Sequence, residues 1–254
     1  MTLRRLLFAA ILAPLLLAAA CKSDDACPTC TDIVTTIPWS APESHTYRLK
    51  DGDKDRGQAV LSVKQDGDRL VFTQSFTDDK NNSDESSVTV DGATLKPQSS
   101  TRTVIDSELR KLAETSYEDV ETGKCSSGRI ANIKQSTFKP PSAEKADSTR
   151  SSPLCVPDHS YDNDTSLFIW RTIKFEKGYI VSYRTVLANR RSTQMVTLNV
   201  REQVKVETSA GEVDAWVVDI QADTRTQRAW FAATPDHRLL RYNNDSLVFE
   251  IEEN

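Results

Sequence analysis

Cysteines have the most informative spacing among the residues of this 254-residue chain that could do chemistry. Cys27 and Cys30 form a C-x-x-C pair, the spacing found in thiol–disulfide exchange sites and in half of many zinc sites. No alternation of strand and helix surrounds the pair, and Cys125 and Cys155 are too far apart to supply the second ligand pair of a zinc site. We therefore predict a structural disulfide between Cys27 and Cys30, with thiol–disulfide exchange as an alternative and no metal.

A fifth cysteine follows a segment with the order of an export signal. Arg4 and Arg5 precede an apolar run over Leu6–Leu17, and small residues at 18–20 lead directly into Cys21. A cysteine in this place resembles the bacterial lipobox, whose sulfur receives diacylglycerol before the chain is cut in front of it. We expect residues 1–20 to be a signal peptide and Cys21 to be the lipid attachment site, with acyl chains such as palmitate.

The lipobox resemblance has one departure, since Ala18 stands where leucine is usual. The alternative is an ordinary signal peptide, with Cys21 forming a disulfide. A membrane-spanning helix is not expected, because the apolar run is shorter than the about 20 residues that span a bilayer and Pro14 interrupts it. The expected location is the cell envelope, on the outer face of the cytoplasmic membrane or at the outer membrane, and Lys22 does not decide between them.

Charge and cysteine number narrow the class of protein. The whole chain has 32 basic and 37 acidic residues, and removing Arg4 and Arg5 leaves 30 against 37, a formal net charge of −7. This balance argues against nucleic-acid binding and against electrostatic adsorption to an anionic membrane. Four cysteines remain after Cys21, an even number that fits an oxidising compartment. Of the three possible pairings we favour Cys125–Cys155 with Cys27–Cys30, and the alternative ties Cys27 or Cys30 to the main domain.

Motifs for catalysis or cofactor binding are absent from the sequence. His45, His159 and His237 form no i, i+4 pair and no H-E-x-x-H motif, and no G-x-S-x-G elbow is present. Residues 51–55 begin like a calcium loop, but Arg56 stands where glycine is required. We expect no enzyme activity and no cofactor, and the alternative is an envelope hydrolase that uses Asp and His side chains.

Alternating apolar and polar residues indicate strands over most of the chain. Residues 57–76 alternate on both sides of the Asp66–Asp68 turn, as a hairpin does, and residues 179–252 are the clearest β region. The predicted fold is mainly β, a single curved antiparallel sheet or half-open β-barrel with one or two short helices.

Other segments complete the predicted organisation of one β domain over residues 39–254. A lipid anchor and flexible tether is expected over residues 21–38, and a disulfide-closed loop insertion at about 125–155. Short helices are expected at 105–116 and 166–173, and a long exposed loop at 139–160.

Four strings carry a resemblance to a known kind of domain. DGATLKPQSSTRT at 91–103, YDNDTSLFIWRTIKF at 161–175, VETSAGEVDAWVVDI at 206–220 and TQRAWFAATPDHRLLRY at 226–242 resemble an uncharacterised bacterial cell-envelope family of exported proteins and lipoproteins. The resemblance implies a curved antiparallel sheet, similar in shape to the envelope lipoprotein carriers that hold acyl chains in a half-barrel. The segment between Cys125 and Cys155 departs from the family pattern.

Together these observations predict a monomeric, membrane-tethered, non-enzymatic domain that binds a lipid-like ligand or an envelope protein. The sequence assigns no ligand-binding residues and does not identify the ligand.

Overall fold

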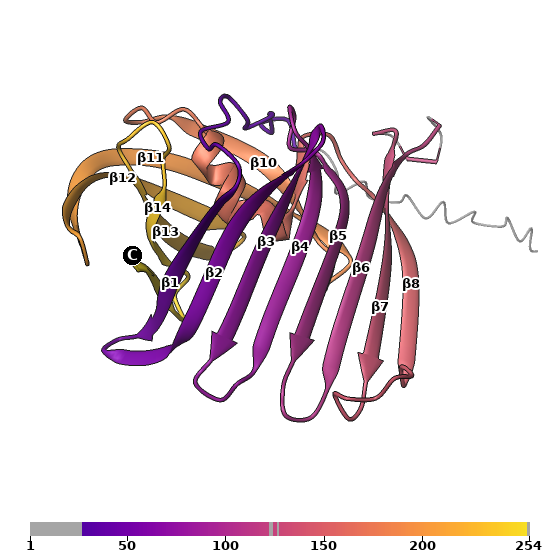
Figure 1. Ribbon diagram of the computed structural model, residues 1–254. Coiled ribbons are helices and arrows are strands. Elements are labelled where there is room, and N and C mark those ends of the chain that lie inside the picture. The colour runs from indigo at the N-terminus through magenta and orange to yellow at the C-terminus, as the bar shows by residue number, and fades with distance from the viewer. Residues whose placement is uncertain (1–26, 122–123, 126, 253–254) are drawn as a thin grey trace, which may run out of the picture.

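The computed structural model describes residues 27–121, 124–125 and 127–252, and these form one large curved sheet with a short helical segment (Figure 1). Fifteen strands pair in the order β8-β7-β6-β5-β4-β3-β2-β1-β15-β14-β13-β12-β11-β10-β9. Their bounds are β1 Glu43–Asp51, β2 Lys54–Asp66, β3 Arg69–Asp78, β4 Ser83–Asp91, β5 Pro97–Ile105, β6 Arg110–Asp119, β7 Arg129–Phe138, β8 Ser148–Cys155, β9 Ser160–Asp162, β10 Ile180–Leu187, β11 Ser192–Thr208, β12 Gly211–Ala222, β13 Arg225–Ala232, β14 Leu239–Asn243 and β15 Val248–Glu252.

This order is a meander in two runs, one from the middle of the sheet to an edge and one from the opposite edge back to the middle. The chain proceeds from β1 to the edge strand β8, continues to the opposite edge at β9, and returns to pair β15 with β1. Because only residues 156–159 separate the two edge strands, the sheet must curl back on itself, although β8 and β9 do not pair. The predicted single curved sheet is confirmed, but it is mixed rather than purely antiparallel, since β9 pairs in parallel with β10.

The core lies on the concave side of the sheet, where alternate residues of both halves meet. Leu61, Phe72 and Val88 from the first half and Leu198 and Ile220 from the second belong to one buried cluster. Period-two alternation places every second residue of a strand on this face, which is why the sequence pattern predicted the strands correctly.

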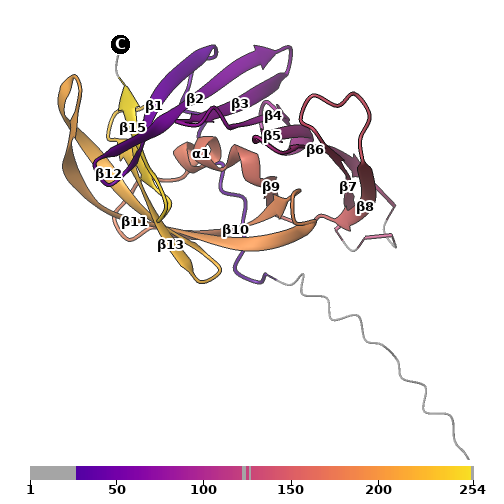
Figure 2. The same ribbon diagram turned by 90° about the horizontal axis from the view of Figure 1, so that it is seen from below.

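A helical segment predicted at 166–173 is confirmed and occupies the interior of the curl (Figure 2). It comprises η1 (Asn163–Thr165), α1 (Ser166–Ile169) and η2 (Trp170–Thr172). Phe168 stacks on Phe72 of β3 with ring centroids 4.6 Å apart, and Trp170 contacts Tyr242 of β14 at 5.7 Å. The two halves of the sheet are thus held apart by the chain's own aromatic side chains.

The N-terminal segment differs from the predicted flexible tether over its described part, residues 27–38. Cys30 forms a bridge with Ser182 at the free edge of β10, and the Thr31 N–H donates to the Ser182 carbonyl at 2.9 Å. Further along, the Thr35 N–H donates to the Thr172 carbonyl, and Ile33 is completely buried in the core. Polar composition predicted a linker here, but burial of Ile33 within the curl fixes the segment on the domain.

The helix predicted at 105–116 is wrong, because these residues form the turn and facing strands of the β5–β6 hairpin. The Asp106 carboxylate accepts the backbone N–H groups of Glu108 and Leu109 at 2.8 and 2.9 Å. The Asp106 side chain therefore closes a tight turn instead of capping a helix, since an Asx turn satisfies the same donors.

The loop predicted at 139–160 is wrong for its second half, which forms the edge strand β8 paired to β7. Both predicted disulfides are confirmed, with Cα–Cα distances of 5.5 Å for Cys125–Cys155 and 5.3 Å for Cys27–Cys30. Cys125–Cys155 therefore closes a hairpin rather than an irregular loop insertion.

Candidate functional site: a cleft inside the curled sheet

A cleft of about 560 Å³ opens on the concave side, between the two halves of the sheet and beside the helical segment. One half contributes residues from β3, β4 and β5, and the other contributes residues from β10, β11 and β12. Its lining residues are Gln74, Phe76, Ser86, Arg102, Asn163, Asp164, Ser166, Leu167, Trp170, Thr185, Leu187, Asn189, Arg190, Gln194, Val196, Ile220, Ala222, Asp223, Thr224, Arg225, Gln227, Tyr242, Asn244 and Phe249.

The apolar part of the lining is aromatic and aliphatic. Phe76 and Phe249 meet edge to face with ring centroids 5.7 Å apart. Leu187 of β10, Val196 of β11 and Trp170 of the helical segment add to this lining. This wall provides a surface suited to hydrocarbon, as in most small-molecule sites.

Arg102 provides the charged part of the lining and is held between two carboxylates. Its Nη2 and Nε donate to the two oxygens of Asp84 at 2.6 and 2.9 Å, and its Nη1 donates to Asp164 Oδ1 at 3.0 Å. Gln74 adds a hydrogen bond from its amide nitrogen to the Asp164 carbonyl. Two strands and the helical segment are therefore joined at one guanidinium group, which fixes its orientation.

Asp162 lies behind Asp164 and is fully buried. It accepts the Tyr117 hydroxyl at 2.6 Å and the Asp164 backbone N–H at 2.9 Å. Burial raises the pKa of Asp162 above its usual range, although these hydrogen bonds oppose the shift. The pKa of Tyr117 is also raised, by burial and by the neighbouring Asp162.

Asp164 is the titratable group of the cleft whose pKa lies near physiological pH. Burial and the nearby Asp162 raise its pKa to about 6, and attraction to Arg102 opposes the shift without cancelling it. The wall of the cleft therefore carries a carboxyl group that changes charge slightly below neutral pH.

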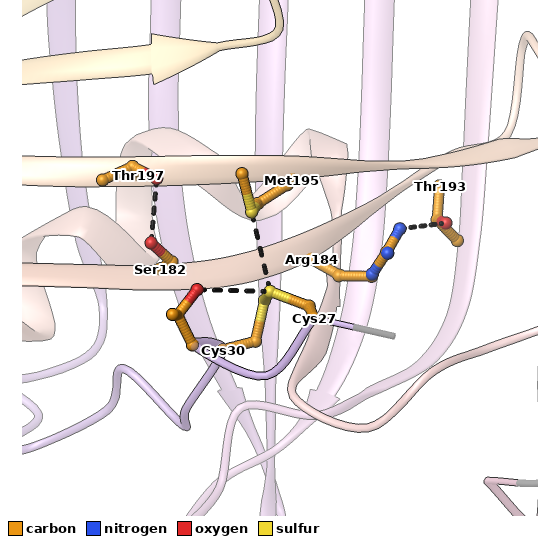
Figure 3. Close-up of a disulfide and its surroundings, with 8 residues drawn as sticks. Cys27, Cys30, Ser182, Arg184, Thr193, Met195 and Thr197 are labelled. Atoms are coloured by element: carbon orange, nitrogen blue, oxygen red, sulfur yellow. Dashed lines mark hydrogen bonds between the residues drawn. A yellow bond between two sulfur atoms is a disulfide. The ribbon is translucent and has the colours of Figure 1, made fainter. Parts of the chain in front are cut away.

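The Cys27–Cys30 disulfide lies outside the cleft, against the outer side of β10 and β11 (Figure 3). Cys27 Sγ lies 3.6 Å from Met195 Sδ. A small cavity beside the disulfide is lined by Cys27, Cys30 and His159 together with Pro28, Ser127, Pro157 and Asp158. The disulfide closes a tight turn within the N-terminal segment, and the backbone of Cys30 and Thr31 pairs with Ser182 of β10.

Two of the three histidines lie near the buried Arg171, at the end of the helical segment. Arg171 forms an ion pair with Glu43 and donates to the His237 carbonyl at 3.1 Å, and His45 Nε2 lies 3.9 Å from Glu43 Oε1. Burial lowers the pKa of both His45 and His237. The polar contacts of this cluster are an ion pair and backbone carbonyls.

His159 lies elsewhere, with Nδ1 3.3 Å from Asp32 Oδ1. The aspartate-rich turn at residues 51–55 joins β1 to β2. Over the described ranges, no group of three or more His, Cys, Asp and Glu side chains is placed to hold a metal ion. Within the same ranges no helix has the length and hydropathy needed to cross a membrane. Cys21, the predicted lipid attachment site, lies outside the described residues.

Sequence reasoning missed the network of Arg102, Asp84 and Asp164. A signal existed, because Asp84 shares a face of β4 with the buried Val88, and Arg102 shares a face of β5 with the buried Ser100. Charged side chains at the inward-facing positions of a strand destabilise the fold unless they have a partner of opposite charge. Their partners are distant in sequence, so the pairing itself could not be read from the strands.

Comparison with known proteins places most of the chain in one family. The family model described as "Protein of unknown function (DUF3108)" matches residues 46–246, about four fifths of the chain. The matched region includes the network of Arg102, Asp84 and Asp164. No curated protein and no solved structure gives a significant match.

Proposed function

Because the chain belongs to the DUF3108 family, whose description names no activity, we propose a function from the cleft itself. The protein is a non-enzymatic binding domain of the cell envelope that is tethered through a lipid on Cys21. Its ligand is a small amphipathic molecule, with an apolar part in the cleft between the two halves of the sheet and a polar group near Arg102 and Asp164.

The observation that carries this proposal is the two-sided lining of the cleft. Phe76 and Leu187 belong to the apolar wall, whereas Arg102 and Asp164 are charged groups joined by a 3.0 Å hydrogen bond. An amphipathic molecule satisfies both surfaces at once, because its hydrocarbon covers the apolar wall and its polar end hydrogen-bonds with the ion pair. A purely apolar ligand would displace water from the charged groups without replacing its hydrogen bonds.

Tethering is supported by the order of residues 1–21 and by the two disulfides. Disulfides persist in oxidising compartments outside the cytoplasm, which is where a signal peptide delivers a protein. A mature net charge of −7 opposes general adsorption to anionic membranes, so a covalent lipid is the simplest route to attachment.

Filling the cleft tests the binding role. Ala222 lies half-buried in the lining, opposite Val196 in the β11–β12 register, so Ala222→Trp places an indole in the cleft. We expect affinity for a fluorescent fatty acid, dansyl-aminoundecanoic acid, to fall about tenfold or more, equivalent to about 1.4 kcal/mol. Ala210→Trp, in the exposed β11–β12 turn, is the matched control and should bind like the wild type.

Native mass spectrometry of the purified protein provides the second measurement, because a resident ligand adds a defined mass that organic extraction removes. The proposal fails if the wild type carries no such molecule and does not bind the fatty acid. It also fails if Ala222→Trp, folded by circular dichroism, binds as tightly as the control.

A further inference from the structure

Two large apolar side chains stay exposed within the part of the chain that the structure describes, Ile180 at 60% and Met195 at 46%. They belong to the paired strands β10 and β11, where Met195 lies opposite Arg184 and Ile180 lies opposite Asn199. Both point outward, because their strand neighbours Val181 and Val196 face the core. Ile180 and Met195 therefore share the outer face of the β10–β11 pair and are exposed there, whereas Val186 of the same face is buried in a second hydrophobic cluster.

The N-terminal part of the chain joins the domain beside this face. Cys27 is the first described residue, and its sulfur contacts Met195 at 3.6 Å (Figure 3). The disulfide to Cys30 and the hydrogen bond from the Thr31 N–H to the Ser182 carbonyl fix this position on the β10 edge.

Few residues separate this place from the proposed lipid. Cys27 follows Cys21 by six residues, which reach at most about 20 Å when fully extended. A lipid on Cys21 would therefore keep Met195 close to the bilayer surface and would keep the far side of the sheet away from it.

Basic residues lie at both ends of β10. Lys177 is exposed three residues before the strand, and Arg191 is exposed in the turn that follows it. Lys174 and Glu176 form an ion pair and add no net charge. This local positive charge contrasts with the acidic balance of the whole chain and suits the headgroups of anionic lipids.

We propose that the outer face of β10 and β11, marked by Ile180 and Met195, rests on the anionic bilayer to which Cys21 is anchored. Ile180 and Met195 contact the boundary between headgroups and acyl chains, and Lys177 and Arg191 lie among the lipid phosphates. This inference rests on the proposed lipid anchor. It adds a fixed orientation, in which the cleft on the inner side of the same strands is turned away from the bilayer surface.

Photo-crosslinking of the full lipidated protein tests this orientation. The photoreactive residue p-benzoylphenylalanine replaces Ile180, Met195 or Thr101 in turn, and each protein is reconstituted in vesicles of phosphatidylethanolamine and phosphatidylglycerol. Thr101 is the control, an exposed residue of β5 in the other half of the sheet (Figure 2). We expect lipid adducts at Ile180 and Met195 about tenfold above those at Thr101, because only a face held at the interface contacts acyl chains.

A second variant tests whether apolar contact holds the face in place. Ile180→Glu should reduce lipid labelling from the probe at Met195 severalfold, whereas Thr101→Glu should leave it unchanged. Equal labelling at all three positions, in protein that sediments with the vesicles, overturns the orientation alone. An N-terminal peptide without diacylglycerol on Cys21 overturns the anchor, and this inference with it.

Discussion

The carboxyl group of Asp164 makes the stability of this domain depend on pH in a direction that can be measured. Burial and Asp162 raise its pKa from 3.8 to about 6, so the folded protein holds this proton more tightly than the unfolded chain does. The stabilisation from this proton is fully present below about pH 4 and is lost as the pH rises through 6. The difference between a pKa of 3.8 and one of about 6 corresponds to about 3 kcal/mol of stability, at about 1.4 kcal/mol per pKa unit.

Asp164→Asn removes this titration while keeping the shape of the side chain. Since Asp164 is mostly buried, with a side-chain exposure of 12%, solvent does little to reduce the effect. The free energy of unfolding of the variant relative to the wild type should therefore rise by about 2 kcal/mol between pH 4.5 and pH 7, most of the full interval. Urea unfolding, followed by tryptophan fluorescence at several pH values, measures this difference.

A matched charge removal separates this effect from a general loss of negative charge. Asp68 is an exposed turn residue, with a side-chain exposure of 96%, and Asp68→Asn should change stability by less than about 0.5 kcal/mol throughout the same range. Asp219 and Glu250 have a lowered pKa because of their arginine and lysine partners, so they affect stability only at lower pH. If the difference in the free energy of unfolding between Asp164→Asn and the wild type does not change with pH, the reasoning about Asp164 is refuted.

Three further variants test what holds the curled sheet together. Cys125 and Cys155 are 30 residues apart, so replacing both with serine releases a long loop. In the chain-entropy model this should lower the free energy of unfolding by about 3–4 kcal/mol. The same replacement of Cys27 and Cys30, three residues apart, should lower it by about 2 kcal/mol. Urea unfolding of the two double variants measures both values, and an equal cost would contradict the loop-length argument. Phe168→Ala should cost about 3–5 kcal/mol, because it leaves a cavity between the helical segment and the sheet, and a thermal midpoint within a degree of the wild type would contradict that role.

Local sequence was sufficient where a structure depends on neighbours in the chain. Alternation through Leu61 and Val63 predicted β2, and the Asp66–Asp68 turn predicted its pairing with β3. The short helix was also predicted, with Asp164 or Thr165 expected as its N-cap, but the side chain that caps the helical segment is that of Asp162. Each of these signals is complete within a few residues.

Prediction failed where one local pattern fits two structures. Asp106 can cap a helix or close an Asx turn, and the pairing of β5 with β6 decided for the turn. Residues 148–155 are polar, yet they form β8 because the β7 edge offers unpaired backbone groups. A polar strand at a sheet edge differs little from a loop in composition.

The candidate functional residues likewise include some that the sequence predicted and some that only the fold brings together. Cys27–Cys30 and Cys125–Cys155 followed from cysteine number and spacing, because the choice among four cysteines is small. Arg102, Asp84 and Asp164 come from two strands and the helical segment, and only the curl of the sheet brings them within hydrogen-bonding distance.

The sequence by itself determined the class of secondary structure, the single sheet and both disulfides, since periodicity and spacing are local properties of the chain. The tertiary structure alone decided that the N-terminal segment is held by Ile33 and the Cys30 bridge, and that the interior contains a helix beside a cleft. The physical reason is that burial depends on what lies opposite a residue. Asp164 has a pKa of about 6 only because the folded sheet places Asp162 and apolar surroundings around it.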